Sequence, residues 1–325
     1  MTKKEVKILE ELKIIGKNVS HFSYEQLKYA IGALIPNLPI VLADYQRVRR
    51  PKEDWMRDFE MLHRARINQL KGKNFTGLYP WQHERDISHV PLEQPELITD
   101  YGRCNRPRDI VFYCSNNAPT SCIEVLSKGF TKKILMHHVT IGHWQIKTPL
   151  TLAEVNFSLA KLTELQQQTD FKYDHLIKRS KSWKEHALKI FAKKGNYPNY
   201  SPEFSLAVLD FFSDHFGNIN IETEHDYFIS SLYTDIIFNH SNTNDEGALF
   251  DGLIYPSVKN ALQEFNIVLH PRAMSKLKFA EATYAWVTSS VGQDPPTVQL
   301  SSWETASPDE LGNLKWNQFK LPRDV

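Results

Sequence analysis

The sequence has little cysteine and no long apolar run. Its three cysteines, Cys104, Cys114 and Cys122, include no C-x-x-C pair, and an odd count argues against a disulfide framework. No apolar stretch approaches the roughly 18 residues that a membrane-spanning helix needs. The first residues also lack the apolar core of a secretory signal. We therefore expect a cytoplasmic, reduced protein that has no membrane partner.

The charge balance excludes another class of partner. The 39 Lys and Arg residues almost equal the 38 Asp and Glu residues, which leaves a formal net charge of +1. Dedicated nucleic-acid binders usually carry a clear basic excess, so we expect no nucleic acid as partner. A chain of 325 residues can bury a sizeable core, as one elaborate domain or as two modest ones.

Several common catalytic and metal-binding motifs are also missing. The sequence contains no G-K-[ST] of a P-loop, no G-x-G-x-x-G and no G-x-S-x-G nucleophile elbow. The densest histidine group is His137, His138 and His143. A strand would place His138 on the face opposite the other two, so three converging ligands are not expected. We predict no metal site, and we expect the cysteines to be buried thiols rather than nucleophiles.

Residue patterns predict an order of helices and strands. Apolar residues at helical spacing predict two helices within residues 5–34, and Ser23 is a suitable N-cap for the second. The remaining predicted helices are 55–70, 118–127, 202–216 and 225–239, together with a long polar helical region over 151–194. The predicted strands are 40–49, 109–114, 134–146, 250–257, 265–270 and 277–287.

This order predicts an α+β fold. Strands lie towards both ends of the chain and helices lie in the middle, so one sheet would be interrupted by a helical insertion at about 150–240. We expect a helical N-terminal extension over 1–39, a main domain over 40–292 and a C-terminal tail over 293–325. The tail either drapes over the body of the protein or is mobile.

Three separated stretches have the character of a ligand site. Y-Q-R-V-R-R (45–50) clusters arginines on a strand edge, although a solvated charged face gives the same pattern. G-R-C-N (102–105) precedes V-F-Y (111–113), and Glu124 follows between apolar residues on the next helix. The alternative there is a core tyrosine and a surface glutamate. D-G-L-I-Y-P-S (251–257) presents Ser257 after a strand broken at Pro256, or is a simple strand-ending turn.

Together these stretches resemble the RES family, which is named for an Arg, a Glu and a Ser in separate motifs. The order R-V-R, G-R-x-N, V-F-Y, a glutamate eleven residues after the tyrosine, and D-G-L-I-Y-P-S carries the resemblance. The later N-I-V-L-H-P and the strand at 277–287 are also similar to that family. The resemblance covers about residues 40–145 and 245–290.

The resemblance implies an ADP-ribosyltransferase-like fold that binds NAD⁺ as substrate and cleaves its nicotinamide–ribose bond, without a cofactor or metal. It implies a toxin whose antitoxin is a separate chain, and it leaves a homo-oligomer open. The residues that match the family's catalytic motif are Arg47, Tyr113, Glu124 and Ser257. The expected substrate-binding residues are Arg47, its rival Arg49, Arg103, Asn105, Tyr113 and Ser257.

The chemistry of NAD⁺ suits these residue types. A guanidinium such as that of Arg47 binds pyrophosphate through bidentate, charge-assisted hydrogen bonds. The ring of Tyr113 can stack on the cationic nicotinamide, and the carboxylate of Glu124 can stabilise an oxocarbenium-like ribose. Ser257 would donate a hydrogen bond to ribose or phosphate. Water or phosphate could be the nucleophile; the alternatives are ADP-ribosyl transfer to a macromolecule and a non-catalytic nucleotide-binding protein.

Overall fold

A ten-stranded sheet forms the centre of the described part of the protein. The computed structural model describes residues 1–45, 61–68, 80–126, 136–168, 173–193, 199–218, 220–239, 250–260, 264–290 and 297–316. The strand order is β1-β5-β6-β7-β3-β2-β4-β8-β9-β10. The strands are β1 (Leu42–Tyr45), β2 (Met61–Ile67), β3 (Phe112–Ser115), β4 (Met136–Ile146), β5 (Leu150–Glu154), β6 (Gly252–Pro256), β7 (Phe265–Leu269), β8 (Leu277–Ser290), β9 (Thr297–Pro308) and β10 (Leu314–Lys315).

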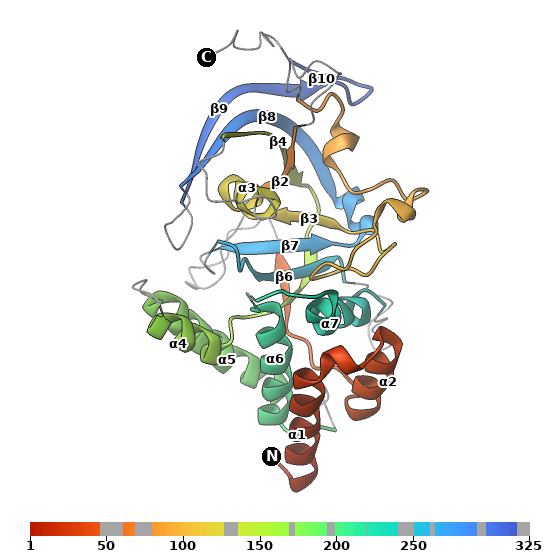
Figure 1. Cartoon of the computed structure of the whole chain (residues 1–325), viewed down its shortest axis with the longest axis vertical. Helices are drawn as coiled ribbons and strands as arrows, with labels where there is room; N and C mark the ends of the chain where they lie inside the picture. Colours follow the sequence, from red (N-terminus) through yellow and green to blue (C-terminus); the bar gives the residue numbers. More distant parts are fainter. Residues whose placement is uncertain are drawn as a thin grey trace.

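Strand pairing defines the fold class. Among the pairs between these strands, β5 and β6 are parallel and the others are antiparallel. Apart from α3, which follows β3 and lies against the sheet, the helices are segregated from this mainly antiparallel sheet instead of alternating with its strands (Figure 1). The protein is therefore α+β, as the sequence predicted.

The sheet is nearly divided in two between β2 and β3. These strands share a single residue pair, His63 with Ser115. On the outer sides of that junction the ladders are longer, because β2 pairs with β4 over seven residues and β3 pairs with β7 over four. In Figure 1, β4, β8 and β9 curve over α3, whereas β3, β7 and β6 run below it. The two half-sheets therefore diverge beside α3.

Seven α-helices lie within the described residues. They are α1 (Lys3–Lys17), α2 (Tyr24–Leu34), α3 (Ala118–Leu126), α4 (Leu159–Gln168), α5 (Asp174–Phe191), α6 (Pro202–Phe216) and α7 (Phe228–Asn239). Thr2 and Ser23 begin α1 and α2 with reciprocal capping boxes, which confirms the predicted role of Ser23. No helix in the described ranges is long and apolar enough to cross a membrane.

The N-terminal helices α1 and α2 and the insertion helices α6 and α7 form one helical layer. Leu12 of α1 and Leu27 of α2 belong to the same buried cluster as Phe212 of α6 and Tyr233 of α7. Tyr255 of β6 joins this cluster, so the layer packs on the half-sheet that contains β6. Figure 1 shows α1, α2, α6 and α7 together at one end of the molecule. The extension and the insertion are separate in sequence but share one core.

Three predicted segments need correction. The predicted helix at 55–70 is wrong, since its described part is strand β2, held between β3 and β4. The insertion is not helical from residue 150, because β5 pairs with both β1 and β6 before α4 begins. The described part of the tail, residues 297–316, belongs to the sheet, because β9 pairs with β8 and β10 pairs with β9. Long-range strand pairing decides all three cases.

Candidate active-site cleft

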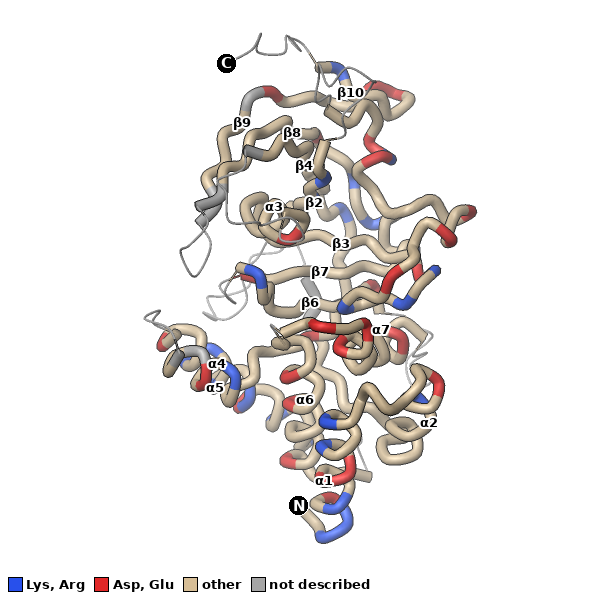
Figure 2. Tube along the Cα trace, viewed as in Figure 1, with Lys and Arg blue, Asp and Glu red and all other residues tan. Residues whose placement is uncertain are grey.

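A cleft of about 700 Å³ opens where β2 and β3 part. Its walls come from β2, β3, α3, the segment 97–105 and Tyr227, which belongs to the helical layer. This volume lies within the range of roughly 300–1,000 Å³ that small-ligand sites commonly have. Figure 2 shows basic residues along β2 and an acidic residue on α3 at this place. The cleft can therefore present both signs of charge to one ligand.

Glu124 is the acidic residue of α3. Asn117 begins this helix by accepting a hydrogen bond from the backbone N–H of Thr120, and Pro119 lies in the first turn, as predicted. One helix face is buried, and the side chain of Glu124 remains 27% exposed at the cleft. Its Oε1 accepts hydrogen bonds from Ser257 Oγ and from Asn266 Nδ2, both at 2.6 Å. The carboxylate is thus fixed from two further strands of the chain.

Ser257 follows β6 and lies behind Glu124. It has no exposed surface, and its hydroxyl donates to Glu124 while accepting from the backbone N–H of Asn260 at 3.3 Å. It does not line the cleft. The expected hydrogen bond from Ser257 to ribose or phosphate therefore does not fit this position. The hydroxyl instead holds the carboxylate.

Tyr113 lines the cleft with its hydroxyl already engaged. The hydroxyl donates to Asn105 Oδ1 at 2.8 Å and accepts from the backbone N–H of Cys104 at 2.9 Å. Burial raises the pKa of Tyr113 well above its usual value, so the hydroxyl stays protonated. Asn105 Nδ2 donates to the carbonyls of Asp100 and Arg106. Asn105 therefore holds the turn and the tyrosine, and Tyr113 offers its ring to a ligand.

Arg103 reaches the cleft wall but binds the helical layer. Its Nη1 donates to the carbonyl of Phe216 at 2.7 Å, and its Nη2 donates to that of Asn218 at 2.9 Å. These carbonyls lie at the C-terminal end of α6, where a cation is stabilising. The guanidinium also lies 5.8 Å from the ring centre of Tyr227. Arg103 thus joins the turn 102–105 to α6.

Arg64 and Arg66 of β2 line the cleft, although neither was predicted as a site residue from the sequence. Arg64 Nη1 donates to the carbonyl of Tyr113 at 3.3 Å, across the gap between β2 and β3. Arg66 Nη2 donates to the carbonyl of Ser88, also at 3.3 Å. Within the described ranges, neither guanidinium forms an ion pair with a carboxylate. These two cations give the cleft an anion-binding character.

The partial burial of these arginines strengthens that inference. Desolvation, followed by the charge of Arg66, lowers the pKa of Arg64 to about 9, and desolvation also lowers the pKa of Arg66. A guanidinium remains charged in proteins, so the direction of the shift reports the cost of burying the charge. A bound anion would offset that cost. The alternation of arginine with apolar residues in R-A-R-I (64–67) is the sequence signal for a strand that places both arginines on one face. The prediction of a helix over 55–70 did not use this signal.

Arg47 and Arg49 lie outside the described residues. Strand β1 is described up to Tyr45, so the position of these two arginines relative to the cleft is not described. The residues that the described chain does bring together are Tyr113, Glu124, Arg103 and Asn105, with Ser257 behind Glu124. The later motifs, from G-R-C-N to D-G-L-I-Y-P-S, therefore meet at one place in the described part of the fold.

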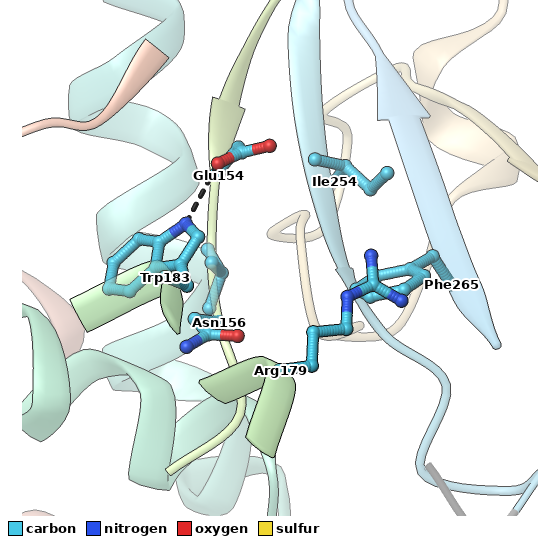
Figure 3. A pocket seen from close by; sticks show the side chains of 7 residues that line it. Glu154, Asn156, Arg179, Trp183, Ile254 and Phe265 are labelled. Carbon is cyan, nitrogen blue, oxygen red and sulfur yellow. Dashed lines mark hydrogen bonds between the residues drawn. The ribbon is translucent and has the colours of Figure 1, made fainter. Parts of the chain in front are cut away.

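Two other features near the sheet do not form a comparable site. His63 and His143 share a hydrogen bond of 2.8 Å between their Nδ1 atoms, but no group of three or more potential metal ligands occurs in the described ranges. A second cavity, drawn in Figure 3, lies between Glu154, Trp183 and Arg179. Its volume is about 20 Å³, roughly the space for one water molecule, and it cannot hold a nucleotide.

Comparisons with protein-family models, with characterised proteins and with solved structures give no match to this chain. Functional assignment therefore depends on the cleft itself and on the motif resemblance.

Proposed function

We propose that this protein cleaves the nicotinamide–ribose bond of NAD⁺ in the cleft between β2 and β3. The observation that carries the proposal is a carboxylate, Glu124, held by two donors in the same cleft as Arg64 and Arg66, two cations that have no carboxylate partner among the described residues. NAD⁺ needs this combination, because its pyrophosphate is anionic and its reacting ribose becomes cationic. The resemblance to the RES family supports the same substrate.

Bond cleavage at this site needs charge stabilisation more than a strong nucleophile. The C1′–N bond breaks and its electron pair moves to the ring nitrogen, so nicotinamide leaves as a neutral molecule. The ribose becomes oxocarbenium-like, and the carboxylate of Glu124 stabilises that positive charge. Water or phosphate then forms the new bond at C1′. When water attacks, its proton passes to Glu124 or to solvent, which gives ADP-ribose.

Substrate binding involves both walls of the cleft. Arg64 and Arg66 bind the pyrophosphate, and the ring of Tyr113 packs against the nicotinamide. Arg47 and Arg49 remain proposed contributors on the basis of the motif resemblance. In this proposal the divided sheet is the ADP-ribosyltransferase-like core, since its opening provides the groove for an extended dinucleotide. NAD⁺ is consumed as substrate, and the roles need no cofactor.

The cellular role proposed here is that of a toxin that depletes NAD⁺. It derives from the RES resemblance, with an antitoxin as a separate partner chain. The helical layer would then be a feature of this chain in addition to the RES-like part. Its Tyr227 lines the cleft, so the layer takes part in forming the site.

The test is to identify the products that the purified chain makes from NAD⁺. Samples are incubated with and without inorganic phosphate and with cell lysate as a source of acceptors, and are then separated by chromatography. Free nicotinamide with ADP-ribose indicates a glycohydrolase, and a phosphorylated ADP-ribose indicates a phosphorylase. Label that remains on protein from radioactive NAD⁺ indicates ADP-ribosyl transfer. Binding of NAD⁺ without release of nicotinamide in any sample would contradict the catalytic proposal and favour a nucleotide-binding protein.

A further inference from the structure

A second residue besides Ser257 supports the carboxylate of Glu124. Asn266 of β7 is 5% exposed, and its Nδ2 donates to Glu124 Oε1 at 2.6 Å. Its Oδ1 accepts a hydrogen bond from Ser115 Oγ at 2.9 Å. The two side chains belong to directly paired residues of β3 and β7, so they lie on the same face of the sheet. Ser115, Asn266 and Glu124 therefore form a continuous chain of hydrogen bonds.

The direction of this chain follows from the groups at its two ends. A carboxylate only accepts hydrogen bonds, so the amide must turn its NH₂ towards Glu124 and its oxygen towards Ser115. Ser115 can donate to that oxygen, and by doing so it favours the required orientation of the amide. The opposite orientation would place the amide oxygen against Oε1 and leave two acceptors in contact within a buried region.

We propose that Asn266 is a positioning residue that fixes the Glu124 carboxylate in the cleft, and that Ser115 sets the orientation of the Asn266 amide. This inference rests on the proposed function for its kinetic consequence, although the hydrogen bonds themselves do not. Asn266 and Ser257 both bind Oε1, from β7 and from the end of β6. The carboxylate is held on one side by the sheet and carried on the other by α3. A carboxylate held in this way stabilises charge without reorganising during the reaction.

The decisive variant is Asn266→Asp, which keeps the shape and replaces the donor with a second carboxylate. The expected result is a fall in kcat of about 10- to 100-fold with KM changed less than about threefold. The acidic limb of the kcat profile should also move to higher pH, because a neighbouring negative charge favours the protonated form of a carboxyl group. The ammonium of Lys259, 4.0 Å from Glu124 Oε2, faces the same carboxylate in both proteins, so it does not remove the difference between them. A purely structural role would lower activity without moving that limb.

A matched control is Asn116→Asp. Asn116 Nδ2 donates to Glu264 Oε2 at 2.8 Å, so this variant also places an aspartate beside a glutamate, away from the cleft lining. Its pH profile and kcat should remain close to those of the unmodified chain. Ser115→Ala is the milder test, and we expect about a 3- to 10-fold loss in kcat without a rise in KM. It also keeps the inference testable if Asn266→Asp does not fold.

A readout independent of turnover separates this inference from the proposed function. The side-chain carboxyl ¹³C signal of Glu124, assigned through Glu124→Gln, is followed from neutral to acidic pH. In Asn266→Asp its protonation should occur at higher pH than in the unmodified chain, and in Asn116→Asp it should not move. If the chain never cleaves NAD⁺, the proposed function fails while this shift still supports the positioning role. An unmoved signal, or unchanged kcat and pH profile in Asn266→Asp, overturns the inference.

Discussion

At the scale of single residues, the acid and the cations of the cleft are held by different kinds of contact. Glu124 is held by Ser257 and Asn266, whereas Arg64 and Arg66 contact backbone carbonyls and aromatic rings in the described chain. An acid that is already hydrogen-bonded stays in place, and cations without carboxylate partners remain attractive to an added anion. This difference suits a site that binds phosphates and stabilises positive charge at one fixed point.

Arg64→Ala should weaken NAD⁺ binding by about 10- to 100-fold, because a partly buried charge-assisted hydrogen bond contributes roughly 1.5–3 kcal/mol. Binding is measured by calorimetry in a Glu124→Gln background, so that the ligand is not consumed. Arg64→Lys serves as the control, since it keeps the charge but loses the bidentate geometry. If Arg47→Ala weakens binding and Arg64→Ala does not, the pyrophosphate binds Arg47 and not Arg64, which contradicts the proposal.

Ser257→Ala should lower kcat by about 3- to 30-fold and leave KM nearly unchanged. The hydroxyl has no exposed surface, so its loss releases Glu124 and removes no contact with substrate. Steady-state kinetics of nicotinamide release measure both parameters. A rise in KM with kcat preserved would mean that Ser257 binds the substrate directly.

At the scale of elements, local signals predicted the parts of the fold that local forces decide. Ser23 fits a capping box, and Pro202–Phe216 carries both an N-cap serine and an amphipathic pattern, so α2 and α6 could be read from the sequence. Strand β2 was not predicted, because M-L-H-R-A-R-I alternates only over its last four residues and its state is decided by long-range pairing with β4. The arginines of the cleft were missed for that reason.

The hydrogen bonds that hold Glu124 could not be predicted from the sequence either. The motifs indicated that Glu124 and Ser257 belong to one site, and the structure brings them into hydrogen-bond contact. Nothing local shows that Ser257 is buried or that Asn266 reaches the same oxygen, because both depend on how β6 and β7 meet α3. Tyr113 lines the cleft, and the engagement of its hydroxyl depends on the turn at 102–105, which no local pattern shows.

Gly102→Ala should disturb that turn. A Cβ at this position would collide with Asn105 Oδ1 and lie 3.0 Å from the Tyr113 hydroxyl. We expect a loss of about 1–3 kcal/mol in the free energy of unfolding, as for other overpacked positions, together with weaker NAD⁺ binding. Chemical denaturation and calorimetry measure the two effects.

Gly32→Ala is the matched control for this substitution. Gly32 lies in α2 with no atom near the added Cβ, so alanine should leave NAD⁺ binding unchanged and should not destabilise the protein. Equal stability and equal binding in Gly102→Ala would contradict the proposed function of the turn in holding Tyr113.

At the scale of the whole molecule, the helical layer and the divided sheet depend on each other. Arg103 binds the end of α6, and Arg106 contacts Asp235 of α7 at 3.7 Å, so the turn beside Tyr113 is tied to two helices of the layer. His215 of α6 lies where α1 packs, next to Gly16. Loosening the layer should therefore affect the cleft, although α1, α2 and α6 lie at the other end of the molecule from β8 and β9 (Figure 1).

Acid should weaken this packing through His215. Burial lowers the pKa of His215 to about 4, and nearby Asp226 only partly opposes that shift. Because the unfolded imidazole has a pKa of about 6.5, the unfolded state binds more protons between these values. The contribution of His215 is therefore complete above about pH 6.5 and is lost towards about pH 4, at no more than about 1.4 kcal/mol per pH unit.

His215→Gln should flatten this part of the pH dependence. Thermal unfolding is followed from about pH 7 to about pH 5, and the fall in Tm should be smaller in the variant than in the unmodified chain. The exposed His21 provides the control, because His21→Gln should leave the slope as it is. The same slope in all three proteins would remove His215 as a source of acid sensitivity.

The role of Glu124 is tested by comparing the unmodified chain with Glu124→Gln, using NAD⁺ binding by calorimetry and the initial rate of nicotinamide release. The amide keeps the size of the side chain and removes its negative charge. We expect an affinity within about threefold and a rate at least about 100-fold lower, because the charge matters mainly when the ribose becomes cationic. A variant that releases nicotinamide at the rate of the unmodified chain would contradict the assignment of Glu124 as the catalytic carboxylate.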